Sequence, residues 1–382
     1  TNITNPLFPV SSQESVLLLG RVDGQAFRTE VTLLPETRII EWEGRRVEVL
    51  VSQYVAFLDG RIQEVAYDLY AQDDAGAVWY FGEDVFNFAD GVIVDTHGTW
   101  IAGKDGPAAM IMPAEPKVGD VYRPENIPGF VFEEVTVTRV DEPLDGPLGP
   151  IEGGLVITEL HMDGGTEDKT FAPGYGEFFT SGGGDTEALA MAVPTDASSG
   201  SLPQQLANQE SGAMHIFDAA GAGDWAAATA GLNEMASTQS HPELEVPRLI
   251  QPRMTANFVA LVEAVRSRDA AAARQLAIEA ARWSLDLQLR HRPVVEVDLA
   301  RMDLWAAQIL VDAEAGDTAS INGDFFAIDY VRDRVLHVLD GAQVTTLNTR
   351  LEELQGAVGD ADPGAAAEAA ARLREALATI GG

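Results

Sequence analysis

The sequence pattern of this 382-residue chain changes once, between Val193 and Gln204. Before this point apolar and polar residues alternate, which is the spacing of half-buried strands; after it, apolar residues recur with the spacing of helices. A β-patterned half and a helical half bury their apolar faces in different ways, so each forms its own core. We therefore predict an antiparallel β domain over residues 1–193, a Ser- and Gly-rich linker over residues 194–203, and a helical bundle domain over residues 204–382.

The first half predicts an antiparallel sheet. Turn-forming pairs such as Asp59-Gly60 and Asp90-Gly91 separate the alternating segments, and Asp-Gly favours the positive φ angles of tight hairpins. Long crossover segments, which parallel strands need, are missing. We expect a β-sandwich or an open barrel, which makes the whole chain an α+β protein. The clearest strand segments are Val47–Val51, Glu64–Tyr70, Ala77–Phe81 and Val131–Val140.

Three consecutive aromatic residues, Trp79, Tyr80 and Phe81, lie in one of these segments. Strand alternation puts Trp79 and Phe81 on one face of the sheet and Tyr80 on the other. Aromatic side chains in strands usually fill the core, so we favour that interpretation. The alternative is a platform for a sugar or an apolar ligand, which requires exposed rings.

The second half predicts a helical bundle. Asp224 and Asp269 stand where N-caps are favourable, and Pro293 must break a helix because it lacks an amide hydrogen. A polar loop is expected over Ser237–Glu245. The expected helices are Gln204–Ala220, Trp225–Met235, a segment from Pro247 to Arg268, Ala270–Leu289, Val294–Glu314, Asp324–Leu339, Gln343–Val358 and Gly364–Ile380.

The charge of the chain excludes several classes of partner. It has 60 acidic residues and 25 basic ones, which gives a formal net charge of −35. We therefore expect no nucleic-acid partner and no charge-driven attachment to an anionic membrane, whereas cations and basic partners remain open. Cysteine is absent, which removes disulfides, thiolate metal sites and cysteine nucleophiles.

The start of the chain favours export. Residues Thr1–Pro6 are polar and lack Met, as expected for a tether that remains after removal of a leader peptide, although a truncated chain would begin in the same way. No run of 18 apolar residues occurs, so we expect no transmembrane segment. The predicted location is extracellular or in the cell envelope, where a lipid tether upstream of this chain is one form of attachment.

A series of short motifs occurs in order in the first half: Asn5–Pro9, Asp68–Asp73, Trp79–Glu83, Met110–Pro113, Val118–Asp120 and Phe171–Gly176. Together they resemble a group of uncharacterised exported bacterial β-domain proteins, which are often lipoproteins. The run Leu285–Pro293 is similar to the helical halves of such proteins. The resemblance implies a curved antiparallel sheet with a late turn at Phe171–Gly176, and it implies no catalytic residue.

One helical segment, Leu285–Trp305, interleaves charges of both signs with large apolar residues at almost every other position. A single apolar stripe cannot collect all of these apolar residues, so some charges must be partly buried, and buried charges pair or bind a ligand. The first explanation is internal pairing at helical spacing. The candidate pairs are Arg282 with Asp286, Asp286 with Arg290, and Asp298 with Arg301.

The second explanation is a metal cation inside the bundle, where facing helices can assemble ligands. Methionines such as Met214 and Met302 would suit copper(I), although methionine at helical spacing more often fills a core. The Glu-x-x-His pairs of di-iron bundles and the His-Glu-x-x-His motif of zinc enzymes are absent. The candidate ligands are His215, Asp218, His291, Glu296, Asp298, Asp303 and His337.

The motifs do not favour an enzyme. A G-x-S-x-G elbow is absent, and Ser181–Asp185 is Gly-rich without the lysine and helix of a phosphate loop. We predict a non-enzymatic exported binding or interaction protein whose partner is a protein, a small ligand or a cation. Two alternatives stay open: a copper, iron or other cation carrier or sensor that uses the helical bundle, and a hydrolase with a site between the domains.

Overall fold

The computed structural model describes residues 2–236 and 244–381. The chain divides into two compact units: a β unit of the residues up to 89 together with residues 93–196, and a helical unit of residues 90–92 together with the residues from 197 on. The last strand ends at Val193 and the first long helix begins at Gln204, the two residues between which the sequence pattern changes. The predicted two-domain α+β fold is confirmed.

The β unit is built on one antiparallel sheet. Its strands are β1 (Ser15–Val22), β2 (Gln25–Trp42), β3 (Arg45–Leu58), β4 (Arg61–Gln72), β5 (Val78–Ala89), β6 (Val92–Asp95), β7 (Trp100–Ile101), β8 (Ala109–Met112), β9 (Val121–Ile127), β10 (Val131–Asp145), β11 (Pro150–His161), β12 (Thr166–Ala172), β13 (Gly176–Gly182) and β14 (Asp185–Val193). They follow the order β6-β5-β4-β3-β2-β1-β14-β13-β12-β11-β10-β9, with β7 and β8 paired to β5. The sheet is open, because the described strands at the two ends of this order do not pair with each other.

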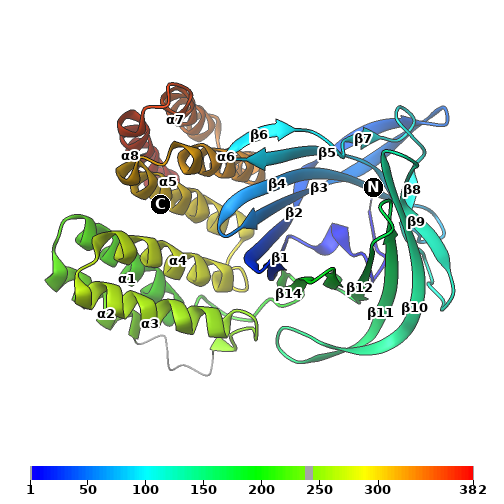
Figure 1. The fold of residues 1–382 in the computed structure, drawn as a ribbon, viewed down its shortest axis with the longest axis horizontal. Helices are drawn as coiled ribbons and strands as arrows, with labels where there is room; N and C mark the ends of the chain where they lie inside the picture. The colour runs from blue at the N-terminus through cyan, green and yellow to red at the C-terminus, as the bar shows by residue number, and fades with distance from the viewer. Residues whose placement is uncertain (1, 237–243, 382) are drawn as a thin grey trace. The chain divides into compact units, whose positions relative to one another are not determined.

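Two meanders make up this sheet. Strands β1 to β6 form the first and β9 to β14 form the second, and antiparallel pairing of β1 with β14 joins them. In Figure 1 the first meander runs from blue to cyan and the second is green, and both are strongly curved. Irregular register contributes to this curvature, because bulges bend a strand. One such irregularity separates Leu33 from Thr37 in β2, and another separates Asp68 from Tyr70 in β4.

The hairpins confirm the predicted turns. Asp59 and Gly60 have φ angles of 46° and 79°, and Asp90 and Gly91 have φ angles of 49° and 74°. Positive φ at two consecutive residues matches the right-handed twist of the flanking strands, which explains why Asp-Gly recurs there. Two residues of the aromatic run have the expected core role, since Tyr80 and Phe81 are only 6% and 4% exposed, whereas Trp79 is half-buried and its indole N–H donates to Asp73.

The helical unit contains α1 (Gln204–Gly221), α2 (Trp225–Ala236), α3 (Gln251–Ser267), α4 (Ala270–Gln288), α5 (Val294–Ala315), α6 (Thr318–Val335), α7 (Gly341–Gly359) and α8 (Pro363–Ile380). The side chain of Asp269 accepts a hydrogen bond from the amide of Ala272, so it is the predicted N-cap of α4. Asp224 accepts from the amides of Ala226 and Ala227 in the same way. The break before Pro293 is also present.

Two predicted helix starts are wrong. Helix α3 begins at Gln251 rather than at Pro247. Helix α6 begins at Thr318 rather than at Asp324, because the side chain of Asp317 accepts from the amide of Ser320 and provides an earlier N-cap. Residues 237–243 of the predicted polar loop lie outside the described residues.

A buried ion-pair network connects three helices of this unit. The guanidinium of Arg301 on α5 contacts Asp286 Oδ1 on α4 at 2.9 Å and Asp298 Oδ1 at 3.0 Å. Arg334 on α6 lies 3.6 Å from the same Asp298 oxygen. Asp286 and Asp298 are fully buried. The predicted burial and pairing of charges in Leu285–Trp305 are therefore present, and the Asp298–Arg301 pair is confirmed.

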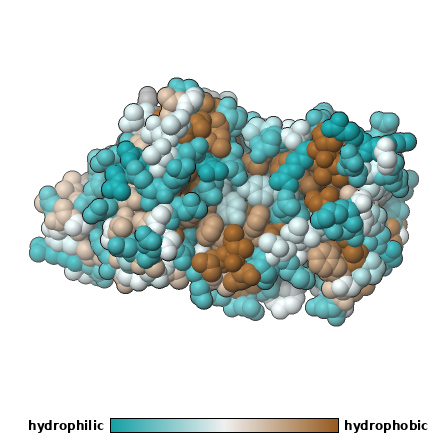
Figure 2. Space-filling model, turned by 90° about the horizontal axis from the view of Figure 1, so that it is seen from above, coloured by the Kyte–Doolittle hydropathy of each residue, from teal (hydrophilic) through white to brown (hydrophobic). Residues whose placement is uncertain are grey.

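The surface is mainly hydrophilic on the face that Figure 2 presents, with separate apolar patches in brown. Exposed apolar side chains include Val92 and Val94 of β6, which ends the strand order at one edge of the sheet. Within the described residues, no helix combines the length and the apolar content that a membrane span requires.

Candidate functional site

One face of the sheet collects carboxylates, and we call it the acidic face. Paired residues of an antiparallel ladder share a face, and alternate residues of a strand return to it. Asp68 pairs with Ser52 and Glu83, and Glu159 pairs with Val135 and Glu167, so these side chains follow one face through each meander. The acidic face comprises Tyr54, Glu64, Asp68, Tyr70, Tyr80, Glu83, Tyr122, Glu125, Glu133, Glu159, His161, Glu167, Lys169, Glu177 and Glu187.

A cavity of about 180 Å³ opens on this face. Its walls differ in chemistry. One part is apolar, and another carries carboxylates beside aromatic rings, which suits a ligand with an apolar body and a positive charge. The apolar part includes Val10, Val16, Leu18, Val31, Leu33 and Ile111, and the polar part includes Tyr54, Asp68, Tyr70, Tyr175, Glu177 and Glu187.

Two cavity carboxylates, Asp68 and Glu187, bind protons more tightly than ordinary carboxylates, and so does Glu83, which pairs with Asp68 across the strand ladder. Burial raises the pKa of Asp68 to about 7, although a hydrogen bond donated by the Tyr80 hydroxyl at 2.6 Å acts in the other direction. Burial, together with the charge of Glu177, raises the pKa of Glu187 to about 8. Burial and the charges of Asp68 and Glu125 raise the pKa of Glu83 to about 10. Removing water disfavours the charged form of each acid.

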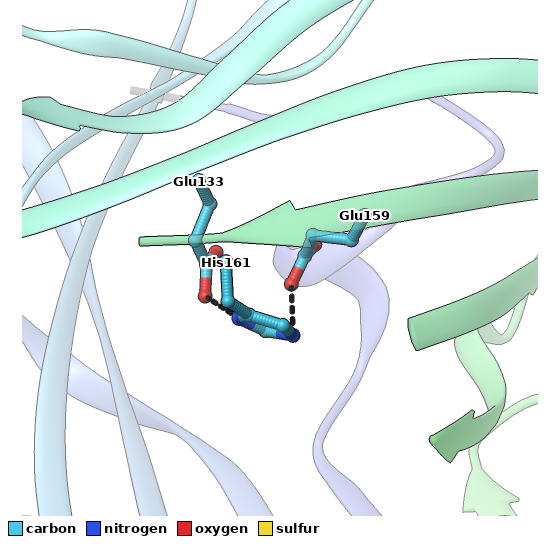
Figure 3. A group of neighbouring side chains, drawn as sticks. All are labelled: Glu133, Glu159 and His161. Atoms are coloured by element: carbon cyan, nitrogen blue, oxygen red, sulfur yellow. Dashed lines mark ion pairs between the residues drawn. The ribbon is translucent and has the colours of Figure 1, made fainter. Parts of the chain in front are cut away.

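A second group of titratable residues lies on the strands β10, β11 and β12. The imidazole of His161 stands between two carboxylates, as Figure 3 shows. Its Nδ1 is 3.3 Å from Glu133 Oε1, and its Nε2 is 3.9 Å from Glu159 Oε1 and 3.5 Å from Glu167 Oε2. The hydrogen bond with Glu133 raises the pKa of His161 to about 9.

Lys169 supplies the other positive charge of this group. Its Nζ is 3.1 Å from Glu159 Oε1 and 4.0 Å from Glu167 Oε2. Burial acts to lower the pKa of Lys169, but the charges of Glu177 and the neighbouring carboxylates raise it well above its usual value. Burial raises the pKa of Glu159 to about 7 against the opposing effect of Lys169.

The ligands predicted in the helical bundle do not come together. The carboxylates have arginine neighbours instead. Asp298 contacts Arg301 and Arg334, and Asp303 accepts two hydrogen bonds from Arg374, at 2.9 and 3.2 Å. Glu296 pairs with Arg292 at 3.2 Å, and Asp218 lies 4.0 Å from Arg374. His215 is exposed and its Nδ1 is 3.0 Å from Glu234, His291 lies between α4 and α5, and His337 is exposed. A metal in the bundle therefore stays a prediction.

One group of side chains on the sheet does have the spacing that a metal ion needs. Glu133, Glu159 and His161 place one ligand atom each within 4.8 Å of the others, and no other group of three or more His, Asp or Glu residues does so in the described ranges. The sequence carries a signal for part of this group, because Glu159 and His161 are two residues apart in a strand and share a face. Glu133 and Glu167 join them only through strand register.

The raised pKa values of Asp68 and Glu187 predict that stability falls as pH rises. In the unfolded chain these groups release their protons near pH 4, whereas in the folded chain they keep them until about pH 7 and 8. Between these values the folded state binds more protons, so the free energy of unfolding decreases by up to about 1.4 kcal/mol per pH unit for each group.

The variants Asp68→Asn and Glu187→Gln should each flatten this slope between pH 5 and 8. Urea unfolding across this pH range, in 0.5 M salt to screen the net charge, measures it. The exposed carboxylate Glu48 provides the control variant, Glu48→Gln, which should keep the wild-type slope. A wild-type stability that rises from pH 5 to pH 8 would contradict the prediction.

Comparisons with known proteins identify no family. No family model and no curated protein matches the chain. Among solved structures, the chain is similar to a crystal structure described as a “putative lipoprotein” from Parabacteroides distasonis ATCC 8503. The identity is 11%, the TM-score is 0.25, and the match covers 50% of this chain and 100% of that one. A TM-score at this level carries no argument about fold or function.

Proposed function

We propose that this chain is an exported, non-enzymatic binding protein of the bacterial cell envelope, and that its β unit binds a small organic cation. Export is supported by the ordered motifs between Asn5 and Gly176, which resemble those of exported bacterial β-domain proteins. The ligand class is supported by one observation above all: the cavity of the acidic face joins carboxylates and tyrosine rings to an apolar wall.

The charge and shape of the cavity favour an amine. Asp68 and Glu187 lie in its wall, and an ammonium group beside either carboxylate would replace the proton that the buried acid otherwise holds. The rings of Tyr54, Tyr70 and Tyr175 add faces that attract a cation. A volume of about 180 Å³ corresponds to roughly six water molecules, so the ligand must be compact.

The residues that line the cavity also support binding rather than catalysis. They contain Ser52 but no histidine, lysine or cysteine that would activate or replace it as a nucleophile.

The test compares amines with neutral molecules of the same shape. Calorimetric titration with n-butylamine and benzylamine should show binding to one site, whereas n-butanol and benzyl alcohol should bind at least tenfold more weakly, because they lack the charge. Asp68→Asn and Glu187→Gln should each weaken amine binding about tenfold or more, and Glu48→Gln should leave it unchanged.

The pH dependence gives a second readout. The ammonium needs ionised carboxylates, and those of Asp68 and Glu187 are protonated at pH 5 in the empty cavity. Amine affinity should therefore rise from pH 5 to pH 8. Equal affinity for amines and alcohols, or amine binding that both cavity variants retain, would refute the proposal.

A further inference from the structure

The cavity of the acidic face has a carboxylate on each side of an apolar floor. Asp68 is on β4 and Glu187 is on β14, and the strands β3, β2 and β1 lie between these two in the sheet. Across the cavity, a carboxylate is therefore followed by apolar strands and then by a second carboxylate. The cavity residues that β1 and β2 contribute are all apolar, namely Val16, Leu18, Val31 and Leu33.

The two carboxylates have no basic residue beside them in the cavity lining. Among the described residues that line it, none is a lysine, an arginine or a histidine. The Tyr80 hydroxyl donates to Asp68 at 2.6 Å, and the Thr29 hydroxyl donates to Glu187. A carboxylate has about four acceptor positions, so one hydroxyl leaves room for an ammonium. Lys169 acts on Glu187 from outside the lining, but burial prevails and raises the pKa of Glu187 to about 8.

The strand order sets the distance that a ligand would bridge. From β4 to β14 there are four strand spacings of about 4.8 Å, roughly 19 Å along the sheet. Asp68 and Glu187 nevertheless line one cavity of about 180 Å³, so both project from the inner side of the curved sheet and lie closer together than this path. Burial and the charges of both acids raise the pKa of Tyr54 on β3, so one hydroxyl is within reach of both charges.

We propose, on the basis of the amine site described above, that the ligand of this cavity is a linear diamine of about four to six carbons. One ammonium lies at Asp68, the other lies at Glu187, and the methylene chain covers the apolar side chains of β1 and β2. An extended diamine of this length, with a hydrogen bond of about 2.8 Å at each end, connects carboxylate oxygens that are roughly 12–14 Å apart. A monoamine would leave one of the two buried acids with its proton.

The first test compares two ligands that differ only in the second charge. Calorimetric titration of the whole chain at pH 7 with pentane-1,5-diamine should show binding at least tenfold tighter than with 5-aminopentan-1-ol, because the second ammonium gains a charge-assisted hydrogen bond. Propane-1,3-diamine is too short to reach both acids. It should therefore bind no more than about twofold more tightly than 3-aminopropan-1-ol, which is the statistical advantage of two equal ends.

The second test removes one acid at a time. Asp68→Asn and Glu187→Gln should each reduce the ratio of pentane-1,5-diamine affinity to 5-aminopentan-1-ol affinity to about twofold, because the second ammonium then has no carboxylate. A neutral amide resembles the protonated acid of the empty cavity, so we expect both variants to fold, and circular dichroism checks this. The control variant Glu48→Gln, at an exposed carboxylate, should keep the wild-type ratio.

The third test counts protons. At pH 6 both acids hold a proton in the empty cavity, because the pKa of Asp68 is about 7 and that of Glu187 is about 8. The diamine should release about two protons and the amino alcohol about one, as measured by titration in buffers of different ionisation enthalpy. The other titratable groups near the two acids are present with both ligands, so the difference reports on the second acid. These groups are Glu64, Tyr70, Tyr80 and Glu83 near Asp68, and Glu167, Lys169 and Glu177 near Glu187.

The outcomes separate this ligand from the amine site on which it rests. Equal affinity of the wild type for pentane-1,5-diamine and 5-aminopentan-1-ol would overturn the diamine and leave the amine site intact. A tenfold ratio that persists in Asp68→Asn or in Glu187→Gln would also overturn it, because the second ammonium would then bind elsewhere. Absence of binding by every amine would overturn both the diamine and the amine site.

Discussion

The variant Arg301→Met should lose about 3–5 kcal/mol of unfolding free energy, because it removes a counter-charge that two buried aspartates share. Asp286 and Asp298 are fully buried, and each accepts a contact of about 3 Å from the Arg301 guanidinium. Arg334 remains 3.6 Å from Asp298. Urea unfolding followed by far-ultraviolet circular dichroism, which reports on the helices, measures the change.

Arg350→Met is the matched control for this variant. Arg350 pairs with Glu353 at 2.9 Å, but about a third of each side chain is exposed, and such pairs contribute less than about 1 kcal/mol. A similar small loss for both variants would show that the buried network is not structural. The segment from Asp286 to Asp298 would then again be a candidate ligand site.

Lys169→Met should cost about 3 kcal/mol or more at pH 8, because it leaves the buried Glu159 carboxylate without its lysine. The side chain of Glu159 is only 3% exposed, and Lys169 Nζ lies 3.1 Å from it. At pH 5 the loss should shrink, because the pKa of Glu159 is about 7 and the acid is then protonated. The destabilisation should therefore increase with pH through this range.

Lys104→Met is the matched control for Lys169→Met. Lys104 lies 3.5 Å from Asp105, but its side chain is 76% exposed, so the substitution should cost less than about 1 kcal/mol at either pH. Thermal unfolding of both variants at pH 5 and pH 8 gives the four values required. A loss for Lys169→Met that is the same at both pH values would contradict this account of the Glu159 charge.

The sequence predicts the fold class better than the site. Period-two alternation in Glu64–Tyr70 correctly indicates a strand and puts Glu64 and Asp68 on one face. Alternation does not show whether a polar face lies in water or is enclosed when the sheet curves. Enclosure depends on bulges such as the one between Asp68 and Tyr70, and on pairing across the ladder, which no local pattern contains.

In the helical half, local sequence spacing likewise fails to predict some of the ion-pair partners. Asp298 and Arg301 are three residues apart on one helix, so their pairing follows from helical spacing. Asp286 pairs with Arg301, which is on the next helix, and Arg334 joins from α6. These contacts depend on how the helices pack, so sequence spacing predicts the burial of the charges but not all of their partners.

The pairing of β1 with β14 also has a consequence for how the β unit folds. Within each meander, most ladders join strands that follow one another in the chain, whereas this ladder brings Ser15 opposite Val193. Closing so long a loop costs conformational entropy that local hairpins do not, so we expect the two meanders to form before they join. The cavity draws Val16 from β1, Asp68 from β4 and Glu187 from β14, so a chain with both meanders formed but not joined would have no binding site.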